Sequence, residues 1–208
     1  MRVAVVLDIV GHLLRRFSLA FLAPLALAIL DGLDGPVGFG EAVAFAVGGA
    51  TTIGAGLLLG RRLPAVPVLA RSEALAVVSF SWLAVALLGG IPFVVAGVSP
   101  VDAFFESMSG FTTTGATILT DFAAHHRAIH LWRCMTQWFG GLGVIALFVV
   151  VLPRLGIAGR QVFFAEGSAA AGEAVSPQVR QAARRLWVLY VALTLVETLA
   201  LVLTGFPL

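Results

Sequence analysis

The chain has 208 residues, of which 60% are hydrophobic and only 12% are charged, and its mean hydropathy is +1.03. Soluble domains carry about a quarter charged residues, so this composition excludes a protein that is surrounded by water on all sides. All 13 basic residues are arginines, and a formal net charge of +2 gives no reason to expect a nucleic-acid partner. We therefore predict an all-α polytopic membrane protein.

Apolar runs of about 20 residues, the length that spans the hydrocarbon core, mark the predicted membrane helices. Their approximate ranges are 13–30, 41–60, 74–97, 132–152 and 186–205. The first run, with the sequence RRFSLAFLAPLALAIL, also has features of a secretory or twin-arginine signal peptide. A retained membrane helix is the preferred interpretation, because further membrane helices follow it.

The arginines predict which side of the membrane each loop faces, because cytoplasmic loops are enriched in basic residues. If residues 103–120 crossed the membrane completely, the five arginines after Pro153 would face the side opposite to those before residue 72. If this segment enters and returns on the same side, 11 of the 13 arginines share one side. We therefore predict a re-entrant hairpin and a cytoplasmic N-terminus.

The predicted hairpin begins with a short helix. Ser99 suits the N-cap, Pro100 the first helical position, and Asp102 the first turn, while Gly110 offers a stop. About ten helical residues extend roughly 15 Å, which is about half of a bilayer. The sequence FTTTGATILT must then return without a full helix, and such backbone is tolerated at this depth only inside protein or along a water-filled path.

The returning segment has the composition of a cation filter. Backbone carbonyls of an uncharged strand can replace the hydration shell of a monovalent cation. Gly115 permits backbone states that are costly for other residues. No carboxylate lies between residues 107 and 120, which disfavours a divalent ion. The predicted ion-binding residues are Thr112, Thr113, Thr114, Gly115, Ala116 and Thr117. Alternatively, such a cluster serves close helix packing in a non-transporting scaffold or assembly subunit.

Small and aromatic residues of the next apolar run allow two interpretations. Gly140, Gly141 and Gly143 could form a bend or gate, but small residues also allow close helix contact, which is slightly favoured. Trp132 and Trp138 are expected either at the membrane interface or in packing.

Several polar residues around the predicted hairpin are candidates for further sites. His125, His126 and His130 lie in a predicted outer loop without the pattern of a transition-metal site, so a solvated loop is favoured. Arg133 could cap the pore mouth or pair with Glu106, which would otherwise be a partly buried carboxylate on the short helix.

The order of VDAFFESMSGFTTTGATIL and LWRCMTQWFGGLGVIALFVVVLPRLGIAGRQVFFAE resembles the Trk/Ktr/HKT superfamily of potassium transporters, specifically its TrkH-like membrane subunits. The resemblance implies four helix–pore–helix repeats, of which this chain would be the N-terminal portion. Thr117 stands where the second glycine of the potassium-channel TVGYG loop would be, which leaves the strength of potassium selection open. The implied parts are two leader helices (1–72), a first repeat (73–153) with filter strand 112–117, a cytoplasmic connector (154–185) and the first helix of a truncated second repeat (186–208).

The same resemblance implies potassium uptake across the bacterial inner membrane, driven by the membrane potential, with potassium as substrate and no bound cofactor. It also implies a homodimer of complete subunits and a TrkA-like cytoplasmic nucleotide-binding regulatory subunit. The chain itself contains neither a GxGxxG nor a GxxxxGK[ST] pattern. An intramembrane enzyme with Ser107 or Ser109 as nucleophile is disfavoured, because the candidate histidine bases lie in the predicted outer loop.

Overall fold

The computed structural model describes residues 1–33, 37–60, 69–120, 127–146 and 177–205. All regular secondary structure within these residues is helical, as the composition predicts. The chain divides into two compact units, Met1–Gly141 and Leu142–Leu208, which are described separately below.

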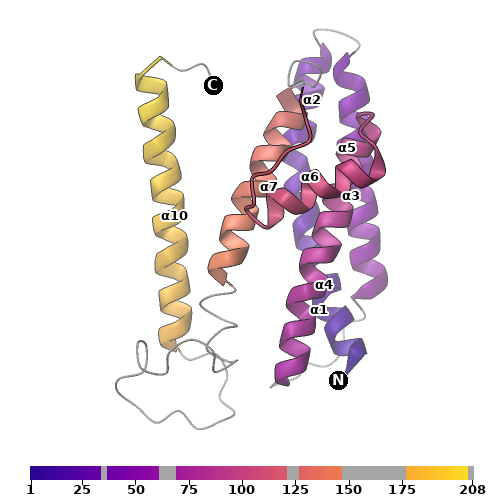
Figure 1. Ribbon diagram of the computed structural model, residues 1–208, viewed down its shortest axis with the longest axis vertical. Helices are drawn as coiled ribbons and strands as arrows, with labels where there is room; N and C mark the ends of the chain where they lie inside the picture. The colour runs from indigo at the N-terminus through magenta and orange to yellow at the C-terminus, as the bar shows by residue number, and fades with distance from the viewer. Residues whose placement is uncertain (34–36, 61–68, 121–126, 147–176, 206–208) are drawn as a thin grey trace. The chain divides into compact units, whose positions relative to one another are not determined.

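The first unit begins with three consecutive helical elements that form one long apolar span. They are α1 (Val3–Phe17), the 3-10 turn η1 (Ser18–Phe21) and α2 (Leu22–Leu33). The candidate membrane span covers Val3–Gly32, and α3 (Val37–Leu59) returns alongside it (Figure 1). The predicted membrane helices 13–30 and 41–60 lie within these elements, apart from Gly60.

The first span starts about ten residues earlier than the sequence suggested. The added residues include two polar side chains, Asp8 and His12. In the structure Asp8 is buried, its carboxylate lies 3.7 Å from the His12 ring, and the His12 ring lies 2.6 Å from the Arg15 guanidinium. These side chains therefore contact one another along one face of α1.

The predicted helix over 74–97 is divided at Gly90 into α4 (Arg71–Gly89) and α5 (Ile91–Val95). The division has a local cause, because Pro92 has no N–H to donate to the carbonyl four residues earlier. At the other end of α4, Glu73 accepts hydrogen bonds from the backbone and the side chain of Arg2 at 2.8 and 2.9 Å. The start of the chain is thereby fixed to the start of α4.

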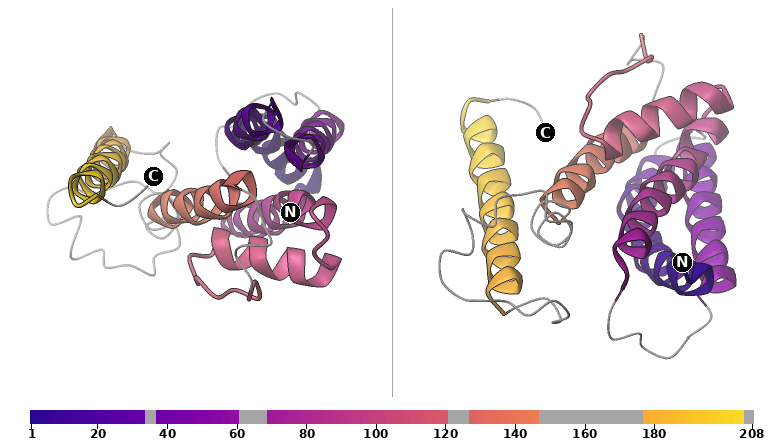
Figure 2. Two further views of the ribbon diagram at one scale, coloured as in Figure 1. Left: turned by 90° about the horizontal axis from the view of Figure 1, so that it is seen from above. Right: turned by 60° about the horizontal axis from the view of Figure 1, so that its bottom comes forward.

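The hairpin region consists of α6 (Pro100–Phe111), an irregular segment and α7 (Arg127–Ala146). After α6 the irregular segment turns back and ends near the N-terminal end of α7 (Figure 1). Seen from above, α1, α2 and α3 are grouped on one side of this unit and α6 runs along the other (Figure 2). At 12 residues, α6 extends only about 18 Å, too short to cross a bilayer.

An aromatic cluster forms the core where α1, η1 and α3 meet α6 and α7. The fully buried Trp132 of α7 packs against Phe21 and Phe45, with ring centroids 4.4 and 6.0 Å apart. Phe17 of α1 meets Phe111, the last residue of α6, edge to face at 5.5 Å. Of the two expectations for Trp132, packing rather than an interfacial position is therefore confirmed.

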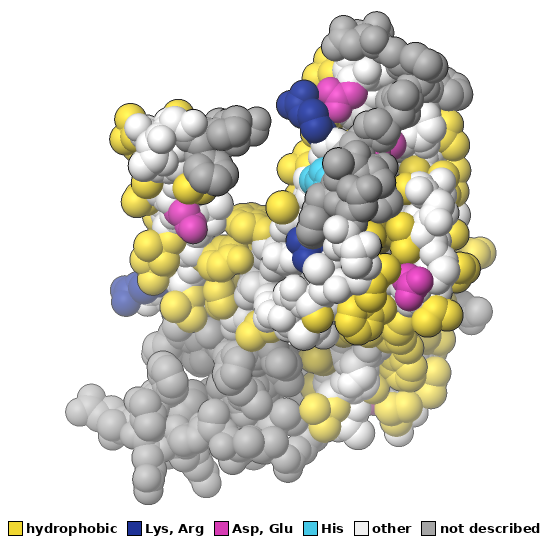
Figure 3. All heavy atoms as spheres, turned by 45° about the horizontal axis from the view of Figure 1, so that its top comes forward, with side chains coloured by type: hydrophobic (Ala, Val, Ile, Leu, Met, Phe, Trp, Pro, Cys, Tyr) yellow, Lys and Arg dark blue, Asp and Glu magenta, His cyan; other side chains and the backbone are white. Residues whose placement is uncertain are grey.

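The outside of the helices carries many exposed apolar side chains, visible in yellow in Figure 3. Leu19, Leu30 and Leu58 are 65%, 60% and 79% exposed. Three helical stretches of the first unit are long and apolar enough to cross a membrane: Val3–Gly32, Gly40–Leu59 and Ser72–Val95. The expected polytopic membrane architecture is therefore supported.

The second unit contains α10 (Pro177–Leu203), of which Ala183–Leu203 is a fourth candidate membrane span. The helix begins nine residues before the predicted boundary at 186, so it includes the end of the predicted connector. The rest of the connector, up to residue 176, lies outside the described residues.

Candidate functional site

The short helix α6 begins as the sequence predicts. The Asp102 amide donates to Ser99 Oγ at 3.3 Å, and Ser99 Oγ donates to Asp102 Oδ2 at 2.7 Å. Pro100 occupies the first position, where its missing N–H has no cost. The helix continues one residue past Gly110 and ends at Phe111, with Thr112 as its C-cap.

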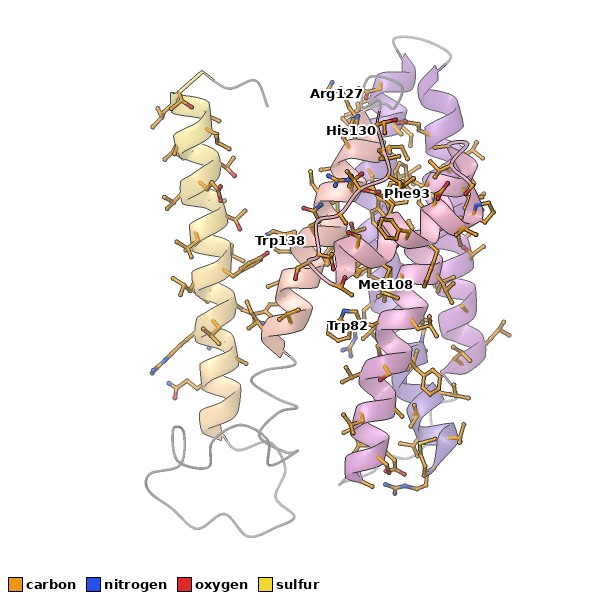
Figure 4. The ribbon with its side chains drawn as sticks, in the orientation of Figure 1. Trp82, Phe93, Met108, Arg127, His130 and Trp138 are labelled. Atoms are coloured by element: carbon orange, nitrogen blue, oxygen red, sulfur yellow. The ribbon has the colours of Figure 1, made fainter. Side chains whose placement is uncertain are left out.

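Two tryptophans bind the last carbonyls of the helices around the hairpin. Trp82 of α4 donates from Nε1 to the Phe111 carbonyl at 3.0 Å, and it lies at the C-terminal end of α6 (Figure 4). Trp132 of α7 donates in the same way to the Gly89 carbonyl at 2.8 Å. Carbonyls at a helix end need such partners when no water reaches them. Sequence reasoning missed both contacts, because each joins residues far apart in the chain.

Glycines allow α7 to approach the end of α6 closely. A Cβ on Gly110 would overlap the buried Thr136 side chain, and a Cβ on Gly140 would lie 2.6 Å from the Gly110 carbonyl oxygen. The helix α7 continues without interruption through Gly140, Gly141 and Gly143. The structure thus gives Gly140 a packing role, and the gate remains a prediction.

The segment after α6 has an unusual backbone. The Thr113 amide donates to the Gly110 carbonyl, and the Thr114 amide donates to the Ser109 carbonyl, both at 2.9 Å. Thr113 has φ +56° and Gly115 has φ +74°. Positive φ is costly for a β-branched residue, by about 1–3 kcal/mol, and such strain concentrates at functional sites. The glycine predicted to need this freedom does use it.

Oxygen atoms dominate this segment, and residues 112–118 are exposed in this chain. The Thr112 and Thr114 hydroxyls are 2.8 Å apart, and the Thr113 hydroxyl donates to the Thr112 carbonyl at 2.7 Å. Within the described part of the chain, the carbonyls of Thr113, Thr114 and Gly115 accept no hydrogen bond. These neutral oxygens are therefore available to a ligand.

The Ala116 and Thr117 positions are fastened to α6 instead. Ser109 Oγ donates to the Ala116 carbonyl at 2.6 Å. Thr117 Oγ1 lies 3.0 Å from both carboxylate oxygens of Glu106. The predicted set Thr112–Thr117 is thus one continuous segment, but the Ala116 carbonyl and the Thr117 hydroxyl are already bound to side chains of α6.

Glu106 is 1% exposed and accepts from Arg133 Nε at 2.6 Å. The predicted pair between α6 and α7 is therefore confirmed. Its additional contacts with Thr117 and with the Ile118 amide, at 3.1 Å, were not foreseen. In the sequence, only the presence of a carboxylate within an apolar stretch indicated that Glu106 has polar partners.

The histidines do not form a metal site in the part of the chain that the structure describes. His130 lies in α7 near Arg127 (Figure 4), rather than in the expected loop. His125 and His126 are outside the described residues. No group of three or more His, Cys, Asp or Glu side chains that could hold a metal occurs among the residues described.

The fold and this segment together define a helical membrane protein with an oxygen-rich, uncharged segment after a short helix. The TrkH family, described as "Cation transport protein", matches residues 44–206. The chain therefore belongs to the TrkH family, whose members are ion transporters and not enzymes. Its family and its apolar helices assign it to a membrane.

Named relatives agree with this assignment. The chain is 33% identical to the Trk system potassium uptake protein TrkH of Halomonas elongata, over 99% of this chain and 42% of the relative. It is 36% identical to TrkH of Vibrio parahaemolyticus, over 96% of this chain and 41% of the relative. It is 30% identical to TrkG of Escherichia coli K12, over 99% and 42%. The chain thus spans about two fifths of the length of these relatives.

Proposed function

We propose that residues 112–117 form one strand of a potassium filter in a Trk-type uptake protein. The observation that carries the proposal is the run of free carbonyls at Thr113, Thr114 and Gly115, directly after a short capped helix. Rings of such carbonyl oxygens can replace the hydration shell of a potassium ion. The relatives named above are potassium uptake proteins.

The proposed path enters the membrane halfway and returns. The supporting observations are the length of α6, the return of the chain toward the start of α7, and the distribution of arginines. With the N-terminus in the cytoplasm of a bacterium, potassium moving inward gains about 2.3 kcal/mol per 100 mV of membrane potential. This gain requires no ATP hydrolysis and no cofactor in this chain.

A single strand cannot surround an ion, so the remaining strands must come from further repeats of the complete subunit. We accordingly propose the division into leader helices (1–72), first repeat (73–153), connector (154–185) and the start of a second repeat (186–208). The relatives are named as members of a Trk system. A homodimer of complete subunits and a TrkA-like nucleotide-binding subunit on the cytoplasmic side are the proposed partners.

The test replaces Gly115 by serine in a complete subunit, formed by this chain followed by the remainder of the Vibrio parahaemolyticus relative. A matched control exists in Gly97, which also has a positive φ of +95° and no atom within 4 Å of an added Cβ. Both substitutions therefore strain the backbone without a clash, but only Gly115 lies in the proposed filter. The measurement is potassium and sodium flux into liposomes.

The Gly115→Ser variant is expected to lose potassium flux or its preference for potassium over sodium, because its carbonyls can no longer keep their positions. The Gly97→Ser variant is expected to retain both. Unchanged selectivity in a correctly inserted Gly115→Ser protein would reject the filter. The threonines and glycine would then serve helix packing in a scaffold.

A further inference from the structure

We propose that Glu106 is a positioning residue, which holds the proposed filter strand against its short helix rather than only joining two helices. The inference rests on the proposed function of residues 112–117. Its starting point is a carboxylate that is 1% exposed and contacts α7 on one side and the returning strand on the other.

Three donors converge on this carboxylate. Oε1 accepts from Arg133 Nε at 2.6 Å, and Oε2 accepts from the Ile118 amide at 3.1 Å. The Thr117 hydroxyl lies 3.0 Å from each oxygen. The same hydroxyl oxygen accepts from the Leu119 amide at 3.1 Å. The carboxylate therefore fixes both the side chain and the backbone of the strand.

A second contact shows that the strand follows the helix in an ordered way. Ser109 binds the Ala116 carbonyl, and Glu106 binds Thr117 and Ile118. Glu106 and Ser109 are three residues apart and so lie on one face of α6. Later residues of the strand therefore contact earlier residues of the helix. The strand is thus antiparallel to α6 and is fastened to it at two successive points.

The free carbonyls of Thr113, Thr114 and Gly115 lie between these fastenings and the end of the helix. The Thr113 and Thr114 amides are bound to the Gly110 and Ser109 carbonyls at the end of the helix, and Ala116 and Thr117 are bound farther along the strand. The positions of the free carbonyls relative to α6 therefore depend on both sets of contacts, and Glu106 supplies part of the second. A buried pair that served only to join α6 and α7 would need no contact with the strand.

The role requires a carboxylate and not merely a polar group. An ionised carboxylate only accepts hydrogen bonds, so all three donors can be satisfied at once. A glutamine would direct its NH₂ group at either the Arg133 Nε–H or the Ile118 N–H. One buried donor would then face another donor and lose its partner. Arg133 offsets the charge that Glu106 carries into this buried position.

The experiment uses the complete subunit described above and compares Glu106→Gln with Asp102→Asn. Both exchange a carboxylate for an amide on α6, but within the described residues the Asp102 carboxylate binds only Ser99 at the helix start. A second pair, Thr117→Val and Thr117→Ser, leaves the Glu106–Arg133 pair in place and removes or keeps the hydroxyl. The measurements are the potassium-to-sodium permeability ratio and the elution profile of the purified protein.

Glu106→Gln and Thr117→Val are each expected to lower the permeability ratio about tenfold, because one buried hydrogen bond to the strand is lost. Asp102→Asn is expected to keep the ratio, and Thr117→Ser to retain more of it than Thr117→Val. If Glu106→Gln does not fold, the Thr117 pair decides the question.

An unchanged ratio in both Glu106→Gln and Thr117→Val, with Gly115→Ser still altering selectivity, would overturn the positioning role and leave the filter intact. If Gly115→Ser also leaves the ratio unchanged, or if the parent protein passes no cations, the filter itself is rejected and the role of Glu106 with it.

Discussion

Replacing Gly140 by alanine tests how closely α7 and α6 must approach. An added Cβ would lie 2.6 Å from the Gly110 carbonyl oxygen and 2.7 Å from that of Phe111, whereas ordinary contacts begin near 3.4 Å. Relieving the overlap therefore requires the helices to separate by about 0.8 Å. Both contacted atoms belong to the backbone, so no side chain can rotate away. Overpacking of this kind costs about 1–3 kcal/mol.

The control is Gly54→Ala in α3, because no atom lies within 4 Å of a Cβ at that helical position. Alanine is favoured over glycine within a helix by about 1 kcal/mol, and both variants receive this gain. We expect Gly54→Ala to be more stable than the parent chain by about 1 kcal/mol, and Gly140→Ala to be less stable than Gly54→Ala by about 1–3 kcal/mol.

Unfolding of the full chain by SDS in mixed micelles, followed by tryptophan fluorescence, gives both free energies of unfolding. If Gly140→Ala matches Gly54→Ala, the close approach of α7 to the end of α6 does not exist in the protein. The packing role of Gly140 would then be wrong, and its role as a hinge would gain support.

Two further substitutions test the packing behind the hairpin, with the same unfolding measurement. Phe17→Ala removes the edge-to-face contact with Phe111 and should cost about 2–3 kcal/mol, whereas Phe80→Ala, at a side chain that is 48% exposed, should cost far less; equal losses would contradict the contact. Trp132→Phe keeps an aromatic ring but leaves the Gly89 carbonyl without its donor, which should cost about 1–3 kcal/mol. A Trp132→Phe protein as stable as its parent would show that another group binds this carbonyl.

The sequence was informative where the relevant chemistry is local. Ser99 and Pro100 lie beside the helix that they start, so the N-cap could be predicted and the structure confirms it. Glu106 and Arg133 could be paired from a charge argument alone, since an isolated carboxylate on a buried helix is costly. The positive φ of Gly115 follows from the residue type in an irregular, uncharged segment.

Contacts between distant residues could not be predicted. Trp82 and its partner carbonyl are 29 residues apart, and Trp132 and its partner are 43 residues apart. Tryptophan in an apolar run suggests an interface or a core, but the choice depends on which helices become neighbours. Thr113 shows the same limit, because nothing in a run of threonines indicates which one adopts φ +56°.

The indole of Trp132 also bears on how this protein is made. Gly89 emerges from the ribosome long before Trp132, so the peptide oxygen at the end of α4 spends that interval without the partner it has in the finished fold. In hydrocarbon a carbonyl without a donor costs several kcal/mol, so this group requires another partner until Trp132 arrives. The C-terminal end of α4 therefore reaches its final hydrogen bonding only after α7 has been synthesised.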